Sequence, residues 1–430
     1  MSTMTQTESG LSSQSLRAMI AAELPDLFAI RHDLHAHPEI GYEEHRTSQV
    51  VQRELTKAKV EFKAGLAGGT GVMAHIPTAK SQGAGRKSQA CAIGLRADMD
   101  ALPIMEETGL PYASSIPNRM HACGHDGHTT ILIGAARVLA RLAKQNGGLP
   151  RPVSFVFQPA EEGGAGGQKM VQEGCLDGSI VGPPVENMFG LHGWPRLPQG
   201  VVGTRVGPLL AASDRFDIVV KGIGSHAAFP HVSRDPIVAA AAIVNALQSI
   251  ASRNVDPLDS VVLSITMLNA GSAYNVIPSQ ATISGTVRSL TPQVQQLAQR
   301  RIDEIASGIA KALGCEARFE YRLGYPVTRN DAEAVEIFNR IARCTVGEKC
   351  VVDLPQPVMG GEDFAFYCEQ VPSCFFVLGL IPPGKKSVPD LHQPDFDFND
   401  NSIATGVEMF CRLALRDNDA EGRTAAARKR

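Results

Sequence analysis

The chain has 430 residues, of which 43% are hydrophobic, and its mean hydropathy is −0.05. This length is typical of two or three globular domains rather than one. The formal charge of −3 lacks the basic excess of most nucleic-acid-binding proteins, so we expect no nucleic-acid partner. We find no apolar run of membrane-spanning length in the sequence, and we expect no membrane partner.

The N-terminal residues and the cysteines predict the compartment. Residues 1–14 are polar and lack the basic start and apolar stretch of a signal peptide. The nine cysteines are an odd number and are scattered mostly among apolar neighbours, as in proteins that keep their thiols reduced. We therefore expect a cytoplasmic protein.

Helices and buried strands alternate in the first half of the chain. Apolar spacing predicts helices over 15–36, 43–59, 126–144 and 166–173, and short apolar runs predict strands over 72–76, 91–96, 153–157 and 187–191. A Gly/Ser/Lys-rich loop over 78–89 separates the first two strands. This alternation is typical of an α/β domain with a mostly parallel sheet flanked by helices.

The order of the predicted elements changes beyond about Gly207. Strands over 216–221, 260–268, 281–288 and 315–321 and helices over 235–251 and 293–312 follow in the order β-α-β-β-α-β. That order is the ferredoxin-like signature, typical of a small α+β domain. A helix over 332–344 and a strand over 374–378 then resume the first pattern.

These patterns predict an insertion of one domain into another. We expect a discontinuous first domain formed by 15–207 and 325–416, with a second domain at 208–324 inserted into it. The charged, Ala-rich tail 417–430 and the polar residues 1–14 are expected to be disordered.

The stretch 120–128 is the strongest chemical signal in the chain. It reads Met-His-Ala-Cys-Gly-His-Asp-Gly-His and places one thiol, three imidazoles and one carboxylate close together. A hydrophobic core does not need this composition, whereas a metal centre does. Cys123 and His125 are candidate ligands on a glycine-hinged loop that enters a helix. His121 and His128 compete with them as ligands, or they are hydrogen-bonded neighbours of the site.

Distant residues add further candidate ligands of the same kind. His192, His392 and Glu162 complete a set of thiolate, imidazole and carboxylate, which suits borderline metals better than magnesium or calcium. Glu161 and Glu162 directly follow the strand 153–157, at the strand end where open α/β sheets build sites. Two adjacent carboxylates can point in different directions, so one can bind metal while the other acts as a general base.

Other polar residues have both a structural and a functional interpretation. Asp98 and Asp100 end a strand, and each either binds metal or orients a ligand histidine, the second role being favoured for Asp100. Glu362 and Asp363 lie at a loop–helix junction and are either helix caps or site residues. His226, in the inserted domain, reaches a substrate only if the domains close or if a second subunit supplies it.

The motifs together resemble those of the M20 metallopeptidase superfamily, and specifically its amidohydrolases. This subgroup includes hippurate hydrolases, bacterial N-acyl-amino-acid hydrolases and plant indole-acetyl-amino-acid hydrolases. The resemblance runs from about Arg31 to about Asp400 and is carried by 34–41, 96–103, 120–128, 158–163, 224–228, 275–278, 359–364 and 391–392. One departure is Gly361, where relatives often carry Ser or Ala.

The resemblance implies a catalytic domain with an inserted lid that often mediates dimers, so we expect a homodimer or higher homo-oligomer. It also implies two divalent metal ions per subunit, which are zinc, manganese, cobalt or nickel. The metal ligands that it implies are Cys123, His125, Glu162, His192 and His392. It demotes Asp98 as a ligand and keeps Asp100 and Glu362 beside the ligands.

The resemblance further assigns roles in catalysis. Glu161 is implied to be the general base that takes a proton from a metal-activated water. His226 is implied to contact the scissile carbonyl, from its own or a neighbouring subunit. Asn275 and Arg288 lie where the family places contacts to the substrate carboxylate.

The expected activity is hydrolysis of N-acyl amino acids that carry an aroyl, aryl-acetyl or acetyl group, releasing a carboxylic acid and a free amino acid. A dipeptidase or carboxypeptidase, or a deacetylase of the N-acetyl-diaminopimelate type, is the alternative on the same scaffold. A non-catalytic metal-binding scaffold is the remote alternative, because Glu161 and all five implied ligands are present.

Overall fold

The computed structural model describes residues 13–78 and 91–416 of the chain. These residues form two compact units. The first contains the described residues up to Gly207, together with Arg329–Pro355 and the residues from Phe366 onward, and the second contains Pro208–Thr328 and Gln356–Ala365. The predicted tails, except for residues 13 and 14, and nearly all of the loop predicted over 78–89 lie outside the described residues.

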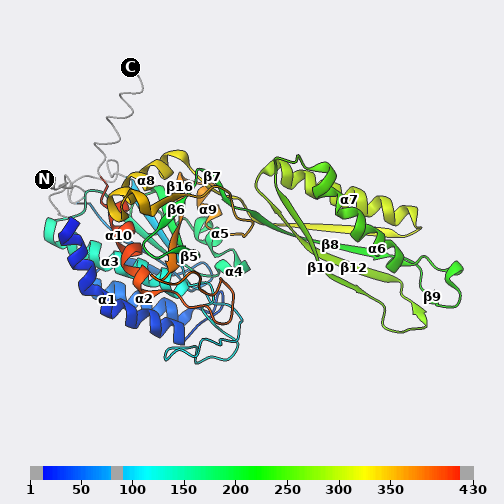
Figure 1. Ribbon diagram of the computed structural model, residues 1–430, viewed down its shortest axis with the longest axis horizontal. Coiled ribbons are helices and arrows are strands. Elements are labelled where there is room, and N and C mark those ends of the chain that lie inside the picture. The colour runs from blue at the N-terminus through cyan, green and yellow to red at the C-terminus, as the bar shows by residue number, and fades with distance from the viewer. Residues whose placement is uncertain (1–12, 79–90, 417–430) are drawn as a thin grey trace, which may run out of the picture. The chain divides into compact units, whose positions relative to one another are not determined.

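One eight-stranded sheet forms the centre of the first unit (Figure 1). Its four middle strands are mutually parallel, and antiparallel pairs join them to the strands on either side. The predicted mostly parallel sheet is therefore confirmed. The strands lie in the order β1 (Glu61–Leu66), β2 (Gly71–Ile76), β4 (Val153–Gln158), β3 (Ala92–Asp98), β5 (Val185–Pro198), β16 (Ser373–Ile381), β6 (Val202–Thr204) and β15 (Val351–Asp353).

Helices cover the sheet of the first unit and bury its apolar side chains. In β4, Val153, Phe155 and Phe157 alternate along the strand toward one face, where they join the main hydrophobic core. The helices that contribute to this core are α1 (Ser13–Ala36), α2 (His45–Ala58), α3 (His125–Asn146), α8 (Ala332–Val346) and α10 (Ile403–Ala414). The chain also forms the short helices α4 (Glu161–Gly164), α5 (Gly166–Gln172) and α9 (Ala365–Cys368).

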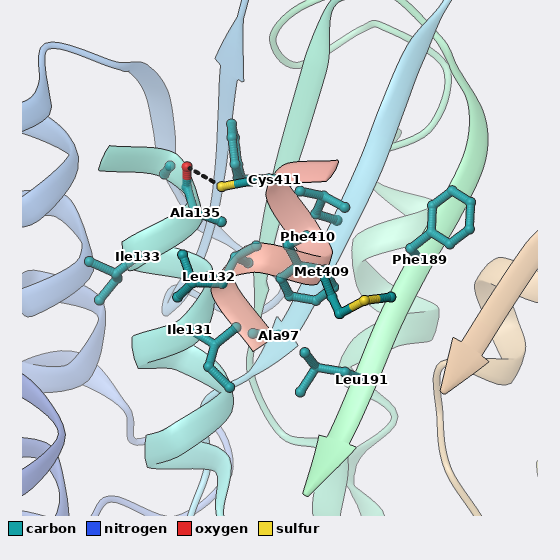
Figure 2. Packing of buried hydrophobic residues seen from close by; sticks show 14 of the residues in the cluster. Ala97, Ile131, Leu132, Ile133, Ala135, Phe189, Leu191, Met409, Phe410 and Cys411 are labelled. Carbon is teal, nitrogen blue, oxygen red and sulfur yellow. Dashed lines mark hydrogen bonds between the residues drawn. The ribbon is translucent and has the colours of Figure 1, made fainter. Parts of the chain in front are cut away.

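Figure 2 shows how α3 and α10 meet over the sheet. Leu132 of α3 and Phe410 of α10 are fully buried in one cluster with Ala97 of β3 and Leu191 of β5. The predicted helix 126–144 is confirmed as α3, whereas α10 was missed. Its apolar residues recur at helical spacing, from Ile403 through Val407 to Phe410, so the signal was present in the sequence.

The second unit has the ferredoxin-like topology that the element order predicted. Its strands β10, β12, β8 and β13 form an antiparallel sheet in that order, and α6 and α7 pack on it through one core (Figure 1). The bounds are β8 (Ala212–Lys221), α6 (Pro236–Leu247), β10 (Val261–Ala270), β12 (Gln280–Ser289), α7 (Pro292–Ala312) and β13 (Glu316–Tyr325). The short strands β9 (Ser225–His226) and β11 (Val276–Ile277) pair with each other.

The chain passes between the two units through β7 (Gly207–Leu210) and β14 (Thr328–Asn330). One further segment, Gln356–Ala365, belongs to the second unit, although the sequence placed it in the discontinuous catalytic domain. Its Val358 donates a backbone hydrogen bond to Leu209, and Gly360 accepts one from Ala211. These contacts are long-range in sequence, so composition and periodicity carry no sign of them.

The expectation that no apolar run is long enough to span a membrane was wrong for one segment. Residues Pro236–Asn254, which are α6 and the π-helical turn after it, are long and apolar enough by length and composition. Ala239, Ile243 and Leu247 on this helix are fully buried in the core of the second unit. Packing on the sheet therefore accounts for the apolar residues on that face.

Candidate metal centre

Adjacent parallel strands bring the distant motifs of the first unit to one edge of its sheet. Asp98, at the end of β3, pairs in register with Gln158 at the end of β4, and β5 continues on the other side of β3 to His192. Because the carboxyl ends of parallel strands meet at the same edge, the loops that follow them share one site. The helix α3 begins at His125, directly after the loop that carries Cys123.

Two groups of candidate ligands share Cys123. Its side chain forms one group with His125 and His192 and another with Glu162 and His392, and within each group the ligand atoms lie within 4.8 Å of one another. The Cys123 Sγ atom is 3.3 Å from His192 Nε2. The structure thus brings together all five residues that the resemblance implied as ligands.

Hydrogen bonds define which ring nitrogen donates in the two buried histidines among the candidate ligands. His125 donates its Nδ1–H to the carbonyl of Asp100 at 2.8 Å, and His192 donates its Nδ1–H to the carbonyl of Gly193 at 2.7 Å. Each neutral ring therefore presents a lone pair at Nε2. The Nε2 atom of His125 is buried and has no hydrogen-bond partner among the described residues. A metal ion would supply a partner for this atom.

His392 approaches the same group from a long loop. Its backbone has φ +65°, in the left-handed region, and its N–H donates to the carbonyl of Ala122 at 2.8 Å. Its Nε2 atom lies 3.2 Å from Glu162 Oε1. The bond to Ala122 thus ties this distant segment to the loop that carries Cys123.

Among the other residues of the 120–128 stretch, His128 forms a further group of candidate ligand atoms with His125 and Asp98. His128 donates from Nδ1 to Asp98 at 2.7 Å and accepts at Nε2 from the N–H of Gly193 at 2.7 Å, so both ring nitrogens are occupied. His121 is buried and its ring nitrogens have no hydrogen-bond partner in the described parts of the chain. Burial lowers the pKa of His121 to about 4, which keeps its ring neutral.

The two aspartates at the end of β3 hold other site residues. Asp98 accepts hydrogen bonds from Arg96 at 2.6 Å and from His128. The carboxylate of Asp100 accepts the N–H of Glu161 at 3.0 Å and that of Glu162 at 2.9 Å, and its carbonyl orients His125. Asp100 therefore supports both a candidate ligand histidine and the turn of the two glutamates.

The Glu161-Glu162 turn has a second support that the sequence analysis missed. Glu44 is buried, and its carboxylate accepts the N–H of Ala160 at 2.8 Å. In the sequence, Glu44 looked like one of two acidic residues at the start of an amphipathic helix. Nothing in the local pattern separates a buried glutamate from its exposed neighbour Glu43, which pairs with Arg119.

The electrostatics of the site favour a bound cation. Burial raises the pKa of the Cys123 thiol well above its ordinary value, and the carboxylates of Glu162 and Glu161 raise it further. Although burial lowers the pKa of His125, Asp98 and Asp100 raise it to about 10, so without a cation its Nε2 atom holds a proton that a bound cation would displace. A divalent cation among these atoms would offset the carboxylate charge and hold the thiol as thiolate. The donor set and its unpaired Nε2 atom fit such an ion.

The predicted substrate contacts belong to the second unit. His226 is exposed on β9, and its Nδ1 atom accepts the N–H of Ala228 at 3.1 Å, so the neutral ring carries its proton on Nε2. The backbone carbonyl of Asn275 accepts the N–H of Ala227, the residue after His226. Arg288 lies on β12 and is half-buried, and burial together with Arg215 lowers its pKa. The roles of these three residues stay predictions.

The segment Gln356–Ala365 carries the remaining predicted residues. Glu362 is buried and accepts the N–H of Phe364 at 2.8 Å, a cap-like contact before α9. Gly361 lies against the second unit, because a Cβ atom there would be 2.9 Å from Ser213 Cβ and 3.0 Å from Arg288 Nη1. The departure at Gly361 therefore makes room for Arg288, within the unit that carries both residues.

Comparison with known proteins identifies the family. Residues 94–416 match the model of peptidase family M20/M25/M40. The chain is 38% identical over 389 residues to an N-acetylcysteine deacetylase of Bacillus subtilis, covering 90% of this chain and 96% of that protein. It is also 38% identical over 387 residues to the hippurate hydrolase of Campylobacter jejuni, covering 90% and 95%.

A solved structure extends this similarity to the fold. The YXEP protein of Bacillus subtilis, described as a dinuclear metal-binding peptidase of family M20, superimposes with a TM-score of 0.77 at 35% identity. The superposition covers 92% of this chain and 98% of that one. With the matching family model and relatives over most of its length, the chain belongs to peptidase family M20/M25/M40 and is a hydrolase.

Proposed function

We propose that the protein is a metal-dependent amidohydrolase that cleaves N-acyl amino acids into a carboxylic acid and a free amino acid. The observation that carries the proposal is the pair of ligand groups that share Cys123, with Glu161 beside them. Glu161 is buried and forms a further group of candidate ligand atoms with His125 and Glu162. The similarity to an N-acetylcysteine deacetylase and a hippurate hydrolase supports the substrate class.

Cys123, His125, Glu162, His192 and His392 would hold two divalent ions. Thiolate and imidazole donors favour zinc, cobalt or nickel, with manganese as the further candidate, over magnesium and calcium. When bound, such ions polarise a carbonyl oxygen and make water more acidic. The dinuclear metal-binding neighbour supports the number of ions but leaves their identity open.

The reaction also needs a group that moves a proton. Glu161 takes a proton from the attacking water and later delivers it to the nitrogen of the leaving amino acid. Asp100 keeps this carboxylate in place by accepting the Glu161 backbone N–H at 3.0 Å. Because Glu162 also belongs to a ligand group with Cys123 and His392 that does not include Glu161, Glu161 can serve as the base.

The second unit would supply the contacts to the substrate. A neutral His226 carries its proton on Nε2, and it would donate this hydrogen bond to the carbonyl oxygen as negative charge develops there. Arg288 would pair with the substrate carboxylate, and Asn275 would donate to it from its side-chain amide. The same subunit or a neighbouring one would present these residues.

The test is release of free amino acid from a panel of N-acyl amino acids, by enzyme stripped with a chelator and then loaded with zinc, manganese, cobalt or nickel. The panel contains hippurate, N-acetylcysteine, an indole-acetyl amino acid, N-acetyl-diaminopimelate and dipeptides. We expect metal-dependent release from at least one N-acyl amino acid. Release from dipeptides alone would make the enzyme a dipeptidase, and no release with any metal would refute the proposal.

Two broader expectations accompany this function. A cytoplasmic location is proposed from the scattered cysteines, all nine of which are free in the structure. A homodimer through the second unit follows from the family resemblance. Fractionation of the source cells and sedimentation of the purified protein test these expectations separately.

A further inference from the structure

The turn that carries Glu161 and Glu162 is held by two buried carboxylates from other segments. Three successive backbone N–H groups donate to them. The N–H of Ala160 donates to Glu44 Oε1 at 2.8 Å. The next two donate to the two oxygens of Asp100, at 3.0 and 2.9 Å. Every N–H from Ala160 to Glu162 is therefore bound by a carboxylate oxygen.

The backbone of this turn is unusual for its sequence. Ala160 has φ 53° and ψ 47°, in the left-handed region, which alanine rarely adopts because its Cβ atom crowds the following carbonyl. Ala165, at the other end of α4, has φ 56°. Residues in such conformations persist only where the surrounding structure holds them. The turn therefore depends on contacts from outside it.

Glu44 is itself held in place from its other oxygen. Its Oε2 atom accepts the hydroxyl of Thr70 at 2.8 Å, and the side chain is fully buried. Burial first, and the nearby charge of Asp100 second, raise the pKa of Glu44 to about 7. No ion pair to Glu44 occurs within the described parts of the chain. Burying a carboxylate without a cation partner destabilises a fold, so stability alone does not explain Glu44.

The residues just before Glu44 contact the same turn. A Cβ atom at Gly41 would lie 3.1 Å from the Cα atom of Ala160, so the two backbones approach closely. Tyr42 donates its hydroxyl to the carbonyl of Gly164 at 2.5 Å. The segment from Gly41 to Glu44 thus contacts both the start and the end of α4.

We propose that Glu44 is a positioning residue for hydrolysis. By accepting the Ala160 N–H, it holds Ala160 in the left-handed conformation, and this conformation directs Glu161 and Glu162 to different positions beside Cys123. Glu44 does not touch substrate or metal and acts only through the turn. The inference rests on the proposed roles of Glu161 as base and Glu162 as ligand.

The test compares Glu44→Leu, which removes the acceptor at similar size, with Glu44→Gln, whose amide oxygen keeps it. For Glu44→Leu we expect kcat to fall about 10- to 100-fold at full metal loading, as for other residues that orient ligands, with a smaller change in KM. For Glu44→Gln we expect kcat within about threefold of wild type, because the acceptor remains. The matched control is Glu54→Leu, another buried glutamate, which pairs with Arg53 and Lys57 on α2.

A spectroscopic readout makes the test independent of turnover. With Co²⁺ as the probe, the visible absorption bands report the ligand geometry around the ion. We expect these bands to shift in Glu44→Leu and to match wild type in Glu44→Gln and Glu54→Leu. If wild-type protein hydrolyses nothing in the substrate panel, the proposed function fails, while the Co²⁺ spectra still decide the role of Glu44.

Two results would overturn the proposal. One is a folded Glu44→Leu protein with wild-type kcat and Co²⁺ spectrum. The other is a Glu44→Gln protein that loses as much as Glu44→Leu, which would make charge rather than the hydrogen bond the important property. If Glu44→Leu does not fold, Glu44→Asp replaces it, because the shorter side chain withdraws the acceptor from Ala160. Glu44→Asp must then show the same loss, and wild-type behaviour would refute the proposal.

Discussion

The histidines of the two units differ in what their Nε2 atoms present. In the first unit His125 and His192 are buried and donate from Nδ1 to carbonyls, so each ring, when neutral, carries a lone pair on Nε2, as a metal ligand requires. In the second unit His226 is exposed and accepts at Nδ1, so its neutral ring carries the proton on Nε2, as a hydrogen-bond donor requires. The backbone group that contacts Nδ1, a carbonyl in one unit and an N–H in the other, thus decides whether Nε2 accepts or donates.

The largest expected effect comes from a change that leaves all these Nε2 atoms in place. Glu161→Gln keeps the size of the side chain but removes the base. We expect kcat to fall about 10²- to 10⁴-fold, the usual contribution of general acid–base catalysis, with metal content unchanged. Metal analysis together with steady-state kinetics checks this. Near-normal turnover would show that the ligand set suffices without Glu161.

Replacing one histidine in each unit tests the comparison directly. His226→Ala removes a donor to the developing oxyanion, so we expect kcat to fall about 10²- to 10³-fold while metal content stays at the wild-type level. His192→Ala removes a lone pair, so we expect loss of bound metal instead. Metal content after dialysis separates the two effects. If both variants lost metal equally, the distinction between the two tautomers would be wrong.

A smaller effect is expected where a carboxylate supports both a ligand and the turn. In Asp100→Asn, an NH₂ group replaces one of the two acceptor oxygens and faces the N–H of Glu161 or Glu162. One of the two hydrogen bonds is therefore lost. We expect a loss of about 10- to 100-fold in metal affinity or kcat. Zinc titration and kinetics measure it. Unchanged values for both would remove Asp100 from the site.

The smallest expected effect concerns a buried histidine that is charged rather than neutral. Although burial lowers the pKa of His35, hydrogen bonds to Asp126 and Glu106 raise it to about 9, above the unfolded value of 6.5. Its stabilisation is therefore complete below pH 6.5 and is lost as the pH rises through about 9. From about pH 6 to about pH 10, we expect wild type to lose roughly 1–3 kcal/mol more unfolding free energy than His35→Gln. Urea unfolding at both pH values checks this, and equal losses would show that His35 is not charged in the fold.

Most of the fold and the candidate ligands could be predicted from local patterns. Apolar periodicity located α3 and β4 closely, because each presents a regular face to one core. The stretch 120–128 indicated a metal centre, because thiol and imidazole groups are rarely concentrated without one. The edge strand β1 was missed, since it is largely exposed and lacks a buried apolar run.

The support of the site could not be predicted in the same way. Asp126, in the first turn of α3, is fully buried and binds Arg31 and His35 from α1, and the stretch 120–128 gives no sign of these partners. The sequence allows His128 to be a metal ligand or a neighbour of the site, whereas in the structure its Nε2 atom accepts the N–H of Gly193. Partners 65 to 95 residues away decide both cases.

The sequence by itself determined which chemistry this protein carries and which strands place it. Candidate metal-binding side chains such as Glu162 and His192 follow the predicted strands 153–157 and 187–191, and both local composition and periodicity record that arrangement. Only the tertiary structure decided how each group is used, because a tautomer, a buried charge or a left-handed alanine depends on which distant backbone group lies within hydrogen-bond distance. Glu44 and Ala160 are far apart in the chain, and their single hydrogen bond exists only once β3 and β4 have paired and the segment before α2 has packed against their ends.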